Sequence, residues 1–358
     1  MRKCRLLRMA LFPLMFAATM ALSGCWDIKD INHRSLPIVM GVKQTGQKYK
    51  VLLLIPEVSR SEMNIKIISE SGITINAILD EINKSLESKL DLLHLKVIIF
   101  ERPVAEMGLA QSIESFMRSR DIPNKTFAAI SDGTLEPLFD KLGASSQGGG
   151  TQLYNFFEKN AGWSPEVVQT RIWEVYRSID SYTRDVAIPS IKPGRTTTIE
   201  STGAAVIKNG RMVGSIDSEE SLLYNLFKGI GTQGKIEVMD RATVKIVADR
   251  LTLSSTLRED QATINAQLNL KVTVLETVGD PSNVEIKQEI DEQLSSRFDT
   301  MLRAAQAKEA DILGMGQFFR NKLSREELQH WRSKYYPSMK IKFKVHVIIQ
   351  DEGQLKIR

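Results

Sequence analysis

Cys25 is the residue whose neighbours most clearly point to chemistry. It ends the tetrapeptide Leu22-Ser23-Gly24-Cys25, in which a leucine and two small residues precede a cysteine. This pattern matches the bacterial lipobox, where a peptidase accepts an extended segment of small side chains and the cysteine thiol forms a thioether to diacylglycerol. The alternative is that Cys25 is a small buried hydrophobe. The residues before it favour lipidation, so we expect cleavage between Gly24 and Cys25 and acylation of Cys25.

Residues 1–24 have the layout of a secretory signal peptide. Four basic residues precede the apolar stretch Met9–Leu22, whose 14 residues are short for a membrane-spanning helix, and no acidic residue occurs among them. A spanning helix needs about 20 apolar residues, and no later stretch reaches that length. Two or three acyl chains on Cys25 would anchor the chain stably, whereas one chain binds a bilayer only marginally. We therefore expect a protein tethered to membrane lipid through acylated Cys25.

The charge of the chain is concentrated in that first segment. The 358 residues carry 48 basic and 43 acidic side chains, and the sequence pI is about 9.0. Without residues 1–24 the balance is 44 basic against 43 acidic, which removes the basic excess that nucleic-acid binding normally requires. Of the two cysteines only Cys25 would remain, so the mature chain would hold no intramolecular disulfide. We expect no nucleic-acid partner.

The sequence predicts a mixed α/β region over residues 25–195, long enough to form two subdomains. Apolar runs at Lys50–Ile55, His94–Phe100 and Lys125–Gly133 predict strands. Between them, Thr74 is a cap for a helix with apolar positions up to Leu90, and Pro103 begins a second helix reaching Met117.

Three segments further along organise the middle of the chain. Gly143–Gly150, "GASSQGGG", predicts a flexible loop, because it lacks the Gly-Lys-Ser/Thr of a phosphate-binding loop. Ser164–Ile179 predicts a helix with Ser164 as cap and Pro165 at the first position. Ile188–Thr198 contains two prolines and a glycine and predicts the boundary of a second domain, residues 196–358.

The patterns in residues 196–358 predict an α+β architecture for the second domain. Asn209-Gly210 joins two apolar runs in a hairpin that ends at Ile216, and a helix follows from Asp217 or Ser218. Alternating strands are expected at Ile264–Val274 and Met339–Ile349, with a long amphipathic helix over Val284–Ile312 between them. Each element would expose an apolar face alone, so we expect sequential mixed domains, the C-terminal one an antiparallel sheet packed by a long helix.

The remaining candidate motifs give no support for catalysis or a cofactor. Gly229–Gly234 fits G-x-G-x-x-G, but a helix precedes it and a strand follows, which is typical of a helix C-terminus rather than a phosphate site. No G-x-S-x-G elbow occurs. The histidines are too scattered for a zinc site, and the acidic pairs fall at expected helix N-termini, where they compensate the helix dipole. These residues are His33, His94, His330 and His346, the last on the polar side of its strand, and Glu219/Glu220 and Glu326/Glu327.

Several blocks of the mature chain resemble the Ger(x)C lipoproteins, the C subunits of spore nutrient germinant receptors. "GCWDIKDIN" resembles the family's Gly-Cys-Trp-Asp opening, and "ISESGITINAILDEINKSLESKLDLLHLKVIIF" resembles its first internal block. "STGAAVIKNGRMVGSIDSEES" resembles its hairpin, and "ADILGMGQFFRN", with the tryptophan and basic-apolar strand after it, resembles its closing Asp-Ile-x-Gly-x-Gly block. Departures such as Ile207 for a common phenylalanine and Ile216 for leucine leave the partner or ligand specificity open but not the resemblance to the family.

The resemblance implies a non-enzymatic role in germination. It implies a mixed α+β fold, a place on the outer face of the spore inner membrane, and two integral membrane subunits, A and B, as partners. The alternative is an extracytoplasmic solute-binding lipoprotein, although such proteins usually have two parallel-sheet lobes around a hinge. An anchored envelope enzyme is a weaker third reading. Trp26 beside the cysteine would either rest at the lipid headgroups or begin the folded domain, and the sequence leaves both open.

Overall fold

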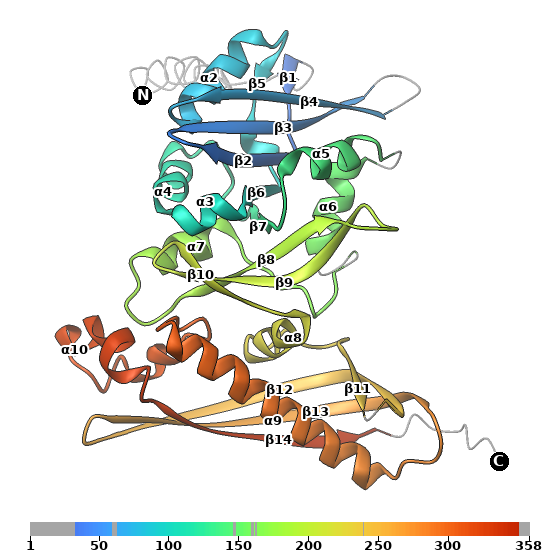
Figure 1. The fold of residues 1–358 in the computed structure, drawn as a ribbon, viewed down its shortest axis with the longest axis vertical. Helices are drawn as coiled ribbons and strands as arrows, with labels where there is room; N and C mark the ends of the chain where they lie inside the picture. The colour runs from blue at the N-terminus through green and yellow to red at the C-terminus, as the bar shows by residue number, and fades with distance from the viewer. Residues whose placement is uncertain are drawn as a thin grey trace, which may run out of the picture. The chain divides into compact units, whose positions relative to one another are not determined.

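The larger of the two main sheets is mixed and has eight strands in the order β10-β9-β8-β7-β6-β2-β3-β4 (Figure 1). The computed structural model describes residues 33–58, 63–145, 148–158, 161, 163–238 and 240–350. Strands β8, β7, β6 and β2 run parallel in the centre, and antiparallel pairings extend the sheet on both sides. The strands are β2 (Val39–Thr45), β3 (Lys48–Val58), β4 (Met63–Gly72), β6 (Val97–Glu101), β7 (Phe127–Ser131), β8 (Val186–Pro193), β9 (Ile199–Lys208) and β10 (Arg211–Ile216). Two short strands, β1 (Arg34–Ser35) and β5 (Lys89–Leu90), lie outside it.

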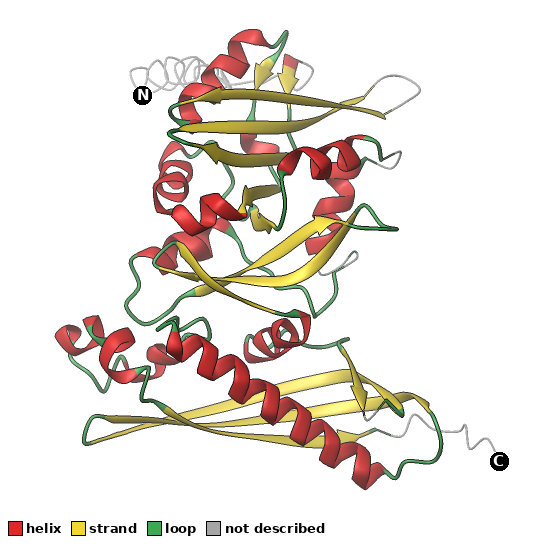
Figure 2. Ribbon diagram, in the orientation of Figure 1, coloured by secondary structure: helices red, strands yellow, loops and turns green. Residues whose placement is uncertain are grey.

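Helices cover both faces of this sheet (Figure 2). Helices α2 (Ile75–Ser85), α3 (Arg102–Met107), α4 (Ala110–Ser119) and α7 (Ile172–Ile179) pack on one face, and α5 (Leu135–Gly143) and α6 (Gly149–Phe157) on the other. Central strands are therefore apolar on both sides: in β6, Ile98 and Phe100 belong to one core and Val97 and Ile99 to the other. This explains why the β6 sequence is a continuous apolar run rather than an alternating one.

Two predicted helices differ from those observed, one because of a glycine conformation and one because other hydrogen bonds compete. The helix expected over 103–117 is divided into α3 and α4 at Gly108, whose φ of +131° is incompatible with a helix. The helix expected from Ser164 begins only at Ile172, because Thr170, Arg171 and Ile172 pair with the start of β7 in an antiparallel bridge. The Ala128 N–H donates to the Thr170 carbonyl at 2.9 Å, and the Ile172 N–H donates to the Thr126 carbonyl at 2.9 Å.

The capping and glycine predictions have mixed outcomes. Thr74 caps α2 by accepting from the Ala77 N–H at 3.2 Å, as expected. Gly229, with φ +70°, follows the end of α8 (Ser218–Phe227), so the interpretation of 229–234 as a helix C-terminus is confirmed. The loop interpretation of Gly143–Gly150 is wrong at its end, because Gly149 and Gly150 begin α6. A Cβ on Gly149 would lie 1.9 Å from the Leu142 carbonyl oxygen, so close packing explains that glycine.

The second sheet has four strands in the order β11-β12-β13-β14 and carries a long helix on one face (Figure 2). Its elements are β11 (Lys235–Val238), β12 (Ala242–Arg258), β13 (Gln261–Thr277), α9 (Asn283–Ala307) and β14 (Lys340–Ile349). Ser282 begins α9 with a reciprocal Ser282–Glu285 capping box. The buried side of α9 comprises Ile286, Ile290, Leu294, Phe298, Met301, Leu302 and Ala305. The expected α+β class, with a helix-packed sheet in the C-terminal part, is confirmed.

One pairing in this sheet differs from the antiparallel expectation. β14 runs parallel to β13, with Thr263 opposite Lys340 and Val272 opposite Ile349. The connection contains α9 and further helical turns, and a crossover of that length allows a parallel partner where a tight turn would not. The other two pairings of this sheet, β11 with β12 and β12 with β13, are antiparallel.

The large sheet also continues across the predicted boundary between residues 195 and 196. β8 lies before the boundary, whereas β9 and β10 lie after it. β9 nevertheless pairs with β8, from Val186 opposite Ile207 to Pro193 opposite Ile199, and β10 pairs with β9. α8 contributes to a core shared by both sheets. Leu223 of α8 belongs to the same core as Ala204 of β9 and Val244 of β12.

Candidate functional site

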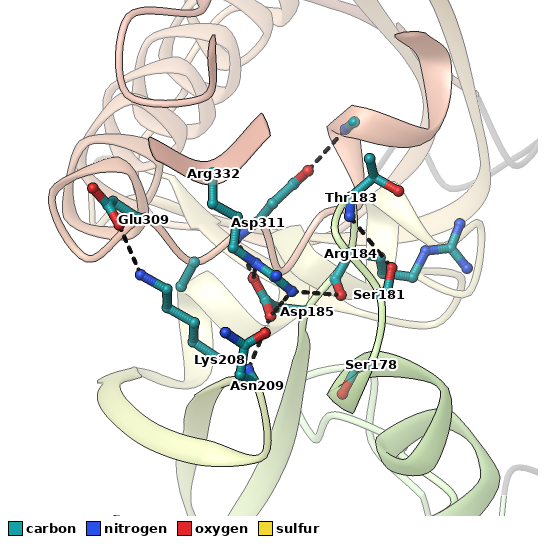
Figure 3. Close-up of polar contacts among 12 residues, drawn as sticks. Ser178, Ser181, Thr183, Arg184, Asp185, Lys208, Asn209, Glu309, Asp311 and Arg332 are labelled. Carbon is teal, nitrogen blue, oxygen red and sulfur yellow. Dashed lines mark hydrogen bonds and ion pairs between the residues drawn. The ribbon is translucent and has the colours of Figure 1, made fainter. Parts of the chain in front are cut away.

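Asp185, Asp311 and Arg332 meet where the large sheet adjoins the C-terminal elements (Figure 3). Asp185 directly precedes β8. Asp311 lies between α9 and the 3-10 turn η3 (Met315–Phe319), and Arg332 lies in the π-helical turn η4 (Trp331–Tyr335) that follows α10 (Arg325–Gln329). We call Asp185, Asp311, Trp331 and Arg332 the latch.

The Arg332 guanidinium holds Asp185 with two parallel hydrogen bonds. Nε donates to Oδ2 at 2.9 Å and Nη2 donates to Oδ1 at 2.7 Å. The Asp185 side chain is fully buried and the Arg332 side chain is 11% exposed. A bidentate pair of this kind is directional, and in a buried setting loss of either partner leaves an uncompensated charge.

Asp311 is bound both through its main chain and through its carboxylate. Its N–H donates to Asp185 Oδ2 at 2.8 Å, and its carbonyl accepts from the Asp185 N–H at 2.8 Å. Its carboxylate accepts from the N–H groups of Met315 and Gly316 at 2.8 Å each and from Trp331 Nε1 at 2.9 Å. Every polar group of the Asp311 side chain is therefore hydrogen-bonded inside the protein.

Two glycines make this arrangement possible. Gly314 has φ +67°, which turns the chain so that the N–H groups after it point back at Asp311. Gly316 lies against the Trp331 ring, and a Cβ there would be 2.7 Å from Trp331 and 2.8 Å from Thr183. Phe319 stacks on Trp331 with ring centroids 5.0 Å apart. The sequence Asp-Ile-Leu-Gly-Met-Gly thus folds as a carboxylate-centred turn under a tryptophan.

Burial raises the pKa values of both carboxyl groups. Removal from water raises the pKa of Asp311 from 3.8 to about 6, against the opposing effect of its three N–H donors. Burial also raises the pKa of Asp185, although Arg332 and the N–H groups of Asp311 and Asn209 favour its charged form. The pKa of the Tyr336 hydroxyl, which donates to the Ala310 carbonyl at 3.2 Å, is raised by burial as well.

Further polar contacts surround the latch (Figure 3). Lys208 of the β9–β10 hairpin pairs with Glu309 at 2.9 Å, and the Asn209 N–H donates to Asp185 Oδ1 at 3.4 Å. Arg332 Nη2 also donates to the Arg184 carbonyl at 3.4 Å. Together these contacts bind the start of β8 and the hairpin beside it to residues 309–332. The charged groups of the latch are satisfied by one another and by N–H donors, so the latch holds segments together rather than facing a substrate.

The structure accounts for the residues singled out in the sequence that lie within it. Glu220 and Glu327 complete capping boxes with Asp217 and Ser324, as their position at helix N-termini predicted. His346 is exposed on β14, also as expected. Cys25 and Trp26 lie outside the described residues. Within the described ranges, no three histidine, cysteine, aspartate or glutamate side chains come close enough to hold a metal ion, and no helix is long and apolar enough to cross a bilayer.

The latch itself did not emerge from sequence reasoning. Asp311 was expected inside a helix reaching Ile312, but α9 ends at Ala307. A signal existed, because an acidic residue at a helix C-terminus opposes the helix dipole and Gly314 follows closely. Asp185 and Arg332 are distant in sequence and carry no comparable signal.

Comparisons with known proteins match most of the chain from residue 27 onward. Residues 27–193 match the family described as spore germination protein N-terminal domain, and residues 202–353 match the family described as spore germination B3/GerAC like, C-terminal. The spore germination protein GerQC of Bacillus cereus is 21% identical over 288 residues, which cover 76% of this chain and 79% of that protein. The spore germination protein B3 of Bacillus subtilis (strain 168) is 26% identical over 145 residues, 38% of each chain.

The fold is also similar to a solved structure. The crystal structure of the GerBC protein superposes with a TM-score of 0.56 over 87% of this chain and 97% of the other, at 13% sequence identity. The last block that resembles the family, Asp-Ile-x-Gly-x-Gly followed by a tryptophan, forms part of the latch. Its aspartate is Asp311, which accepts from the Gly316 N–H and from Trp331 Nε1. With both family profiles matched in order and the fold shared, the chain belongs to the GerAC-like, or Ger(x)C, family of spore germination proteins.

Proposed function

We propose that this protein is a lipid-anchored, non-catalytic subunit of a spore germinant receptor, required for nutrient-triggered germination. The observation that carries the proposal is the ordered match of both germination-family profiles over residues 27–193 and 202–353. The tetrapeptide ending at Cys25 is separated by one residue from the first matched residue, Asp27, which supports an anchor at the start of the mature chain.

The proposed location is the outer face of the spore inner membrane, with Cys25 acylated after cleavage behind Gly24. The apolar stretch before the cysteine is too short to serve as a spanning helix, and lipidation would supply the attachment. The proposed partners are the integral membrane A and B subunits of the receptor. This protein would act through contacts with these subunits. The latch fits a structural rather than a catalytic role, because its polar side chains are hydrogen-bonded to one another and to main-chain groups.

The anchor is tested by replacing Cys25. Cys25→Ala should abolish labelling by a radioactive or alkyne fatty acid and release the protein from washed membranes. Cys4→Ala is the matched control, because it removes the other cysteine of the chain and leaves the tetrapeptide intact. Unchanged fatty-acid labelling and membrane retention of the Cys25 variant would contradict the anchor.

The receptor role is tested by deletion of the gene. Spores should form in normal numbers but lose their optical density slowly when given nutrients, and expression of the intact gene should restore the response. Because homologous receptors could cover the loss, the deletion is best made in a strain that lacks the others. A full response to every nutrient tried in that strain would contradict the proposal.

A solute-binding lipoprotein is the alternative function, and calorimetry separates it from the receptor role. Solute binders usually have two parallel-sheet lobes, whereas here an eight-stranded mixed sheet adjoins a four-stranded one. Titration of the soluble chain, lacking residues 1–25, with neutral amino acids and sugars should give no heat of binding. Clear saturable binding would favour the solute binder.

A further inference from the structure

A cleft lined by four arginines lies beside the latch. Arg177 lies in α7 and Arg184 before β8, whereas Arg320 directly follows η3 and Arg325 begins α10. Asp180 is the one acidic residue among the lining side chains, so the lining carries a net charge of +3. The cleft encloses about 670 Å³, within the range of small-molecule sites.

These four guanidinium groups have no carboxylate partner within the described part of the chain. The ion pairs of the described residues include Arg332 with Asp185 and Lys228 with Glu174, but none that involves Arg177, Arg184, Arg320 or Arg325. Arg177 instead stacks on Trp173, 4.7 Å from the ring centroid. Of the acidic groups nearby, Glu174 is paired with Lys228 and Asp185 with Arg332.

Arg184 is the most unusual of the four. Its side chain is partly buried, and Figure 3 shows it extending away from Asp185 and Arg332 although its carbonyl accepts from Arg332. Burial and the neighbouring Arg177 lower the pKa of Arg184, so the protein holds this guanidinium at an electrostatic cost. Asp311 and Glu174 act in the opposite direction, but within the described residues neither forms an ion pair with Arg184. A partly buried cation outside any ion pair is normally compensated by a bound anion or an acidic side chain.

We propose that the Arg177–Arg184–Arg320–Arg325 cleft is a binding site for a small oxyanion that carries two or more negative charges, such as a phosphate or polycarboxylate group. Planar guanidinium groups donate paired hydrogen bonds that fit phosphate and carboxylate oxygens, which a set of lysines would not do with the same geometry. Ser181, Tyr182 and Gln317 line the same cleft and add polar side chains to it, although the Gln317 amide already donates to Thr183. An uncharged nutrient would leave the arginines uncompensated.

The position of the cleft gives the ligand a structural effect. Two arginines precede β8 and two follow η3, so one anion would connect the same two parts of the chain that the latch connects. Gly314 is in direct contact with Arg184, since a Cβ on it would lie 2.9 Å from Arg184 Nε. Bound anion should therefore stabilise the turn that holds Asp311. This inference does not depend on the lipid anchor or the receptor role.

The test is a titration of the soluble chain with inorganic phosphate and with citrate, by calorimetry and thermal unfolding. Acetate serves as the singly charged control, and all samples have the same ionic strength because salt screens exposed charges. Phosphate or citrate should bind with saturation and raise the unfolding temperature, whereas acetate should not. The variant Arg320→Gln/Arg325→Gln should weaken binding by about tenfold or more, the expected effect of losing charge-assisted hydrogen bonds.

Both replaced arginines are exposed, so the variant should fold, and its unfolding temperature without ligand checks this. Arg258→Gln is the matched control, since it removes the same charge from an exposed position on β12, outside the cleft. Arg184→Lys should also weaken binding, because lysine retains the positive charge but lacks the paired N–H donors of the planar guanidinium. The site is refuted if neither phosphate nor citrate binds, or if Arg258→Gln weakens binding as much as the cleft variant does.

Discussion

Asp185 and Asp311 bind each other through a reciprocal pair of hydrogen bonds, one main chain to main chain and one main chain to carboxylate, both 2.8 Å long. The two residues are 126 positions apart in sequence. Arg332 and Trp331 then hold one carboxylate each, so four side chains fix the contact between the start of β8 and the turn after α9. Four predictions test this arrangement.

Replacement of Arg332 by methionine should be strongly destabilising. It leaves the fully buried Asp185 carboxylate without its cation, and loss of one partner of a buried pair typically costs about 3–5 kcal/mol. Urea unfolding followed by tryptophan fluorescence measures the change. Lys334→Met is the matched control, because its pair with Asp260 is exposed and its loss should change stability little. Equal stability of the Arg332 variant and the parent chain would show that the pair contributes nothing.

Asp311→Asn should lower the free energy of unfolding while preserving the shape of the side chain. The amide puts an NH2 group opposite N–H donors from Met315, Gly316 and Trp331, so at least one buried donor loses its acceptor. An unsatisfied buried group costs about 1–3 kcal/mol. A crystal structure or amide hydrogen exchange of residues 311–316 would locate the effect, and unchanged exchange there would contradict it.

The pH dependence of stability should carry the signature of Asp311. Its pKa in the folded chain is about 6, above the ordinary 3.8, so the folded state binds more protons than the unfolded state between these values. Its contribution to stability is therefore largest below pH 3.8 and is lost as the pH rises through about 6. The two-unit difference corresponds to about 3 kcal/mol.

The measurement compares the parent chain with Asp311→Asn across this range. Other carboxyl groups, including Glu136 with its lowered pKa, act in the opposite direction, so the difference between the two chains is the informative quantity. The stability of the parent relative to the variant should fall from about pH 4 through about pH 6 and level off about one pH unit higher. A difference that rises with pH would show that the Asp311 pKa is lowered instead.

Gly316→Ala should disturb the packing of Trp331. The new methyl group would lie 2.7 Å from the indole, and both the ring and Thr183 are buried, so neither has free space to move into. Overpacking of this kind costs about 1–3 kcal/mol. Gly133→Ala is the control, because nothing lies within 4 Å of its Cβ position. A shifted tryptophan emission spectrum in the Gly316 variant alone would confirm the contact.

Local patterns in the sequence predicted the elements that local interactions determine. The Thr74 cap, the Asn209-Gly210 turn and the buried stripe of α9 depend on residues within a few positions of one another, and all were confirmed. The segment 164–171 has a helical pattern, but its last residues, Thr170 and Arg171, pair with the start of β7, whose sequence lies about 40 residues earlier. The direction of β14 likewise depends on a crossover rather than on its own alternation.

The latch was beyond local reasoning for the same cause. Its members come from residues 185, 311, 331 and 332, and only the folded chain brings them together. Only Asp311 carries a local signal, its acidic side chain just after a helix C-terminus. Asp185 gives none, because a lone aspartate before a strand is commonly a solvated cap. The arginines of the cleft are equally unremarkable in sequence, being spread from 177 to 325.

The pairing of β9 with β8 has a practical consequence for exchanging parts between relatives. A chimaera joined near residue 197 would take β8 from one parent and β9 and β10 from the other, so eight cross-strand partners would have to match across the junction. The Asp185–Arg332 pair would be divided between the parents as well. A junction after Ile216 would keep the large sheet from a single parent and should give the more soluble hybrid, provided that residues 309–332 retain their partners around Asp185.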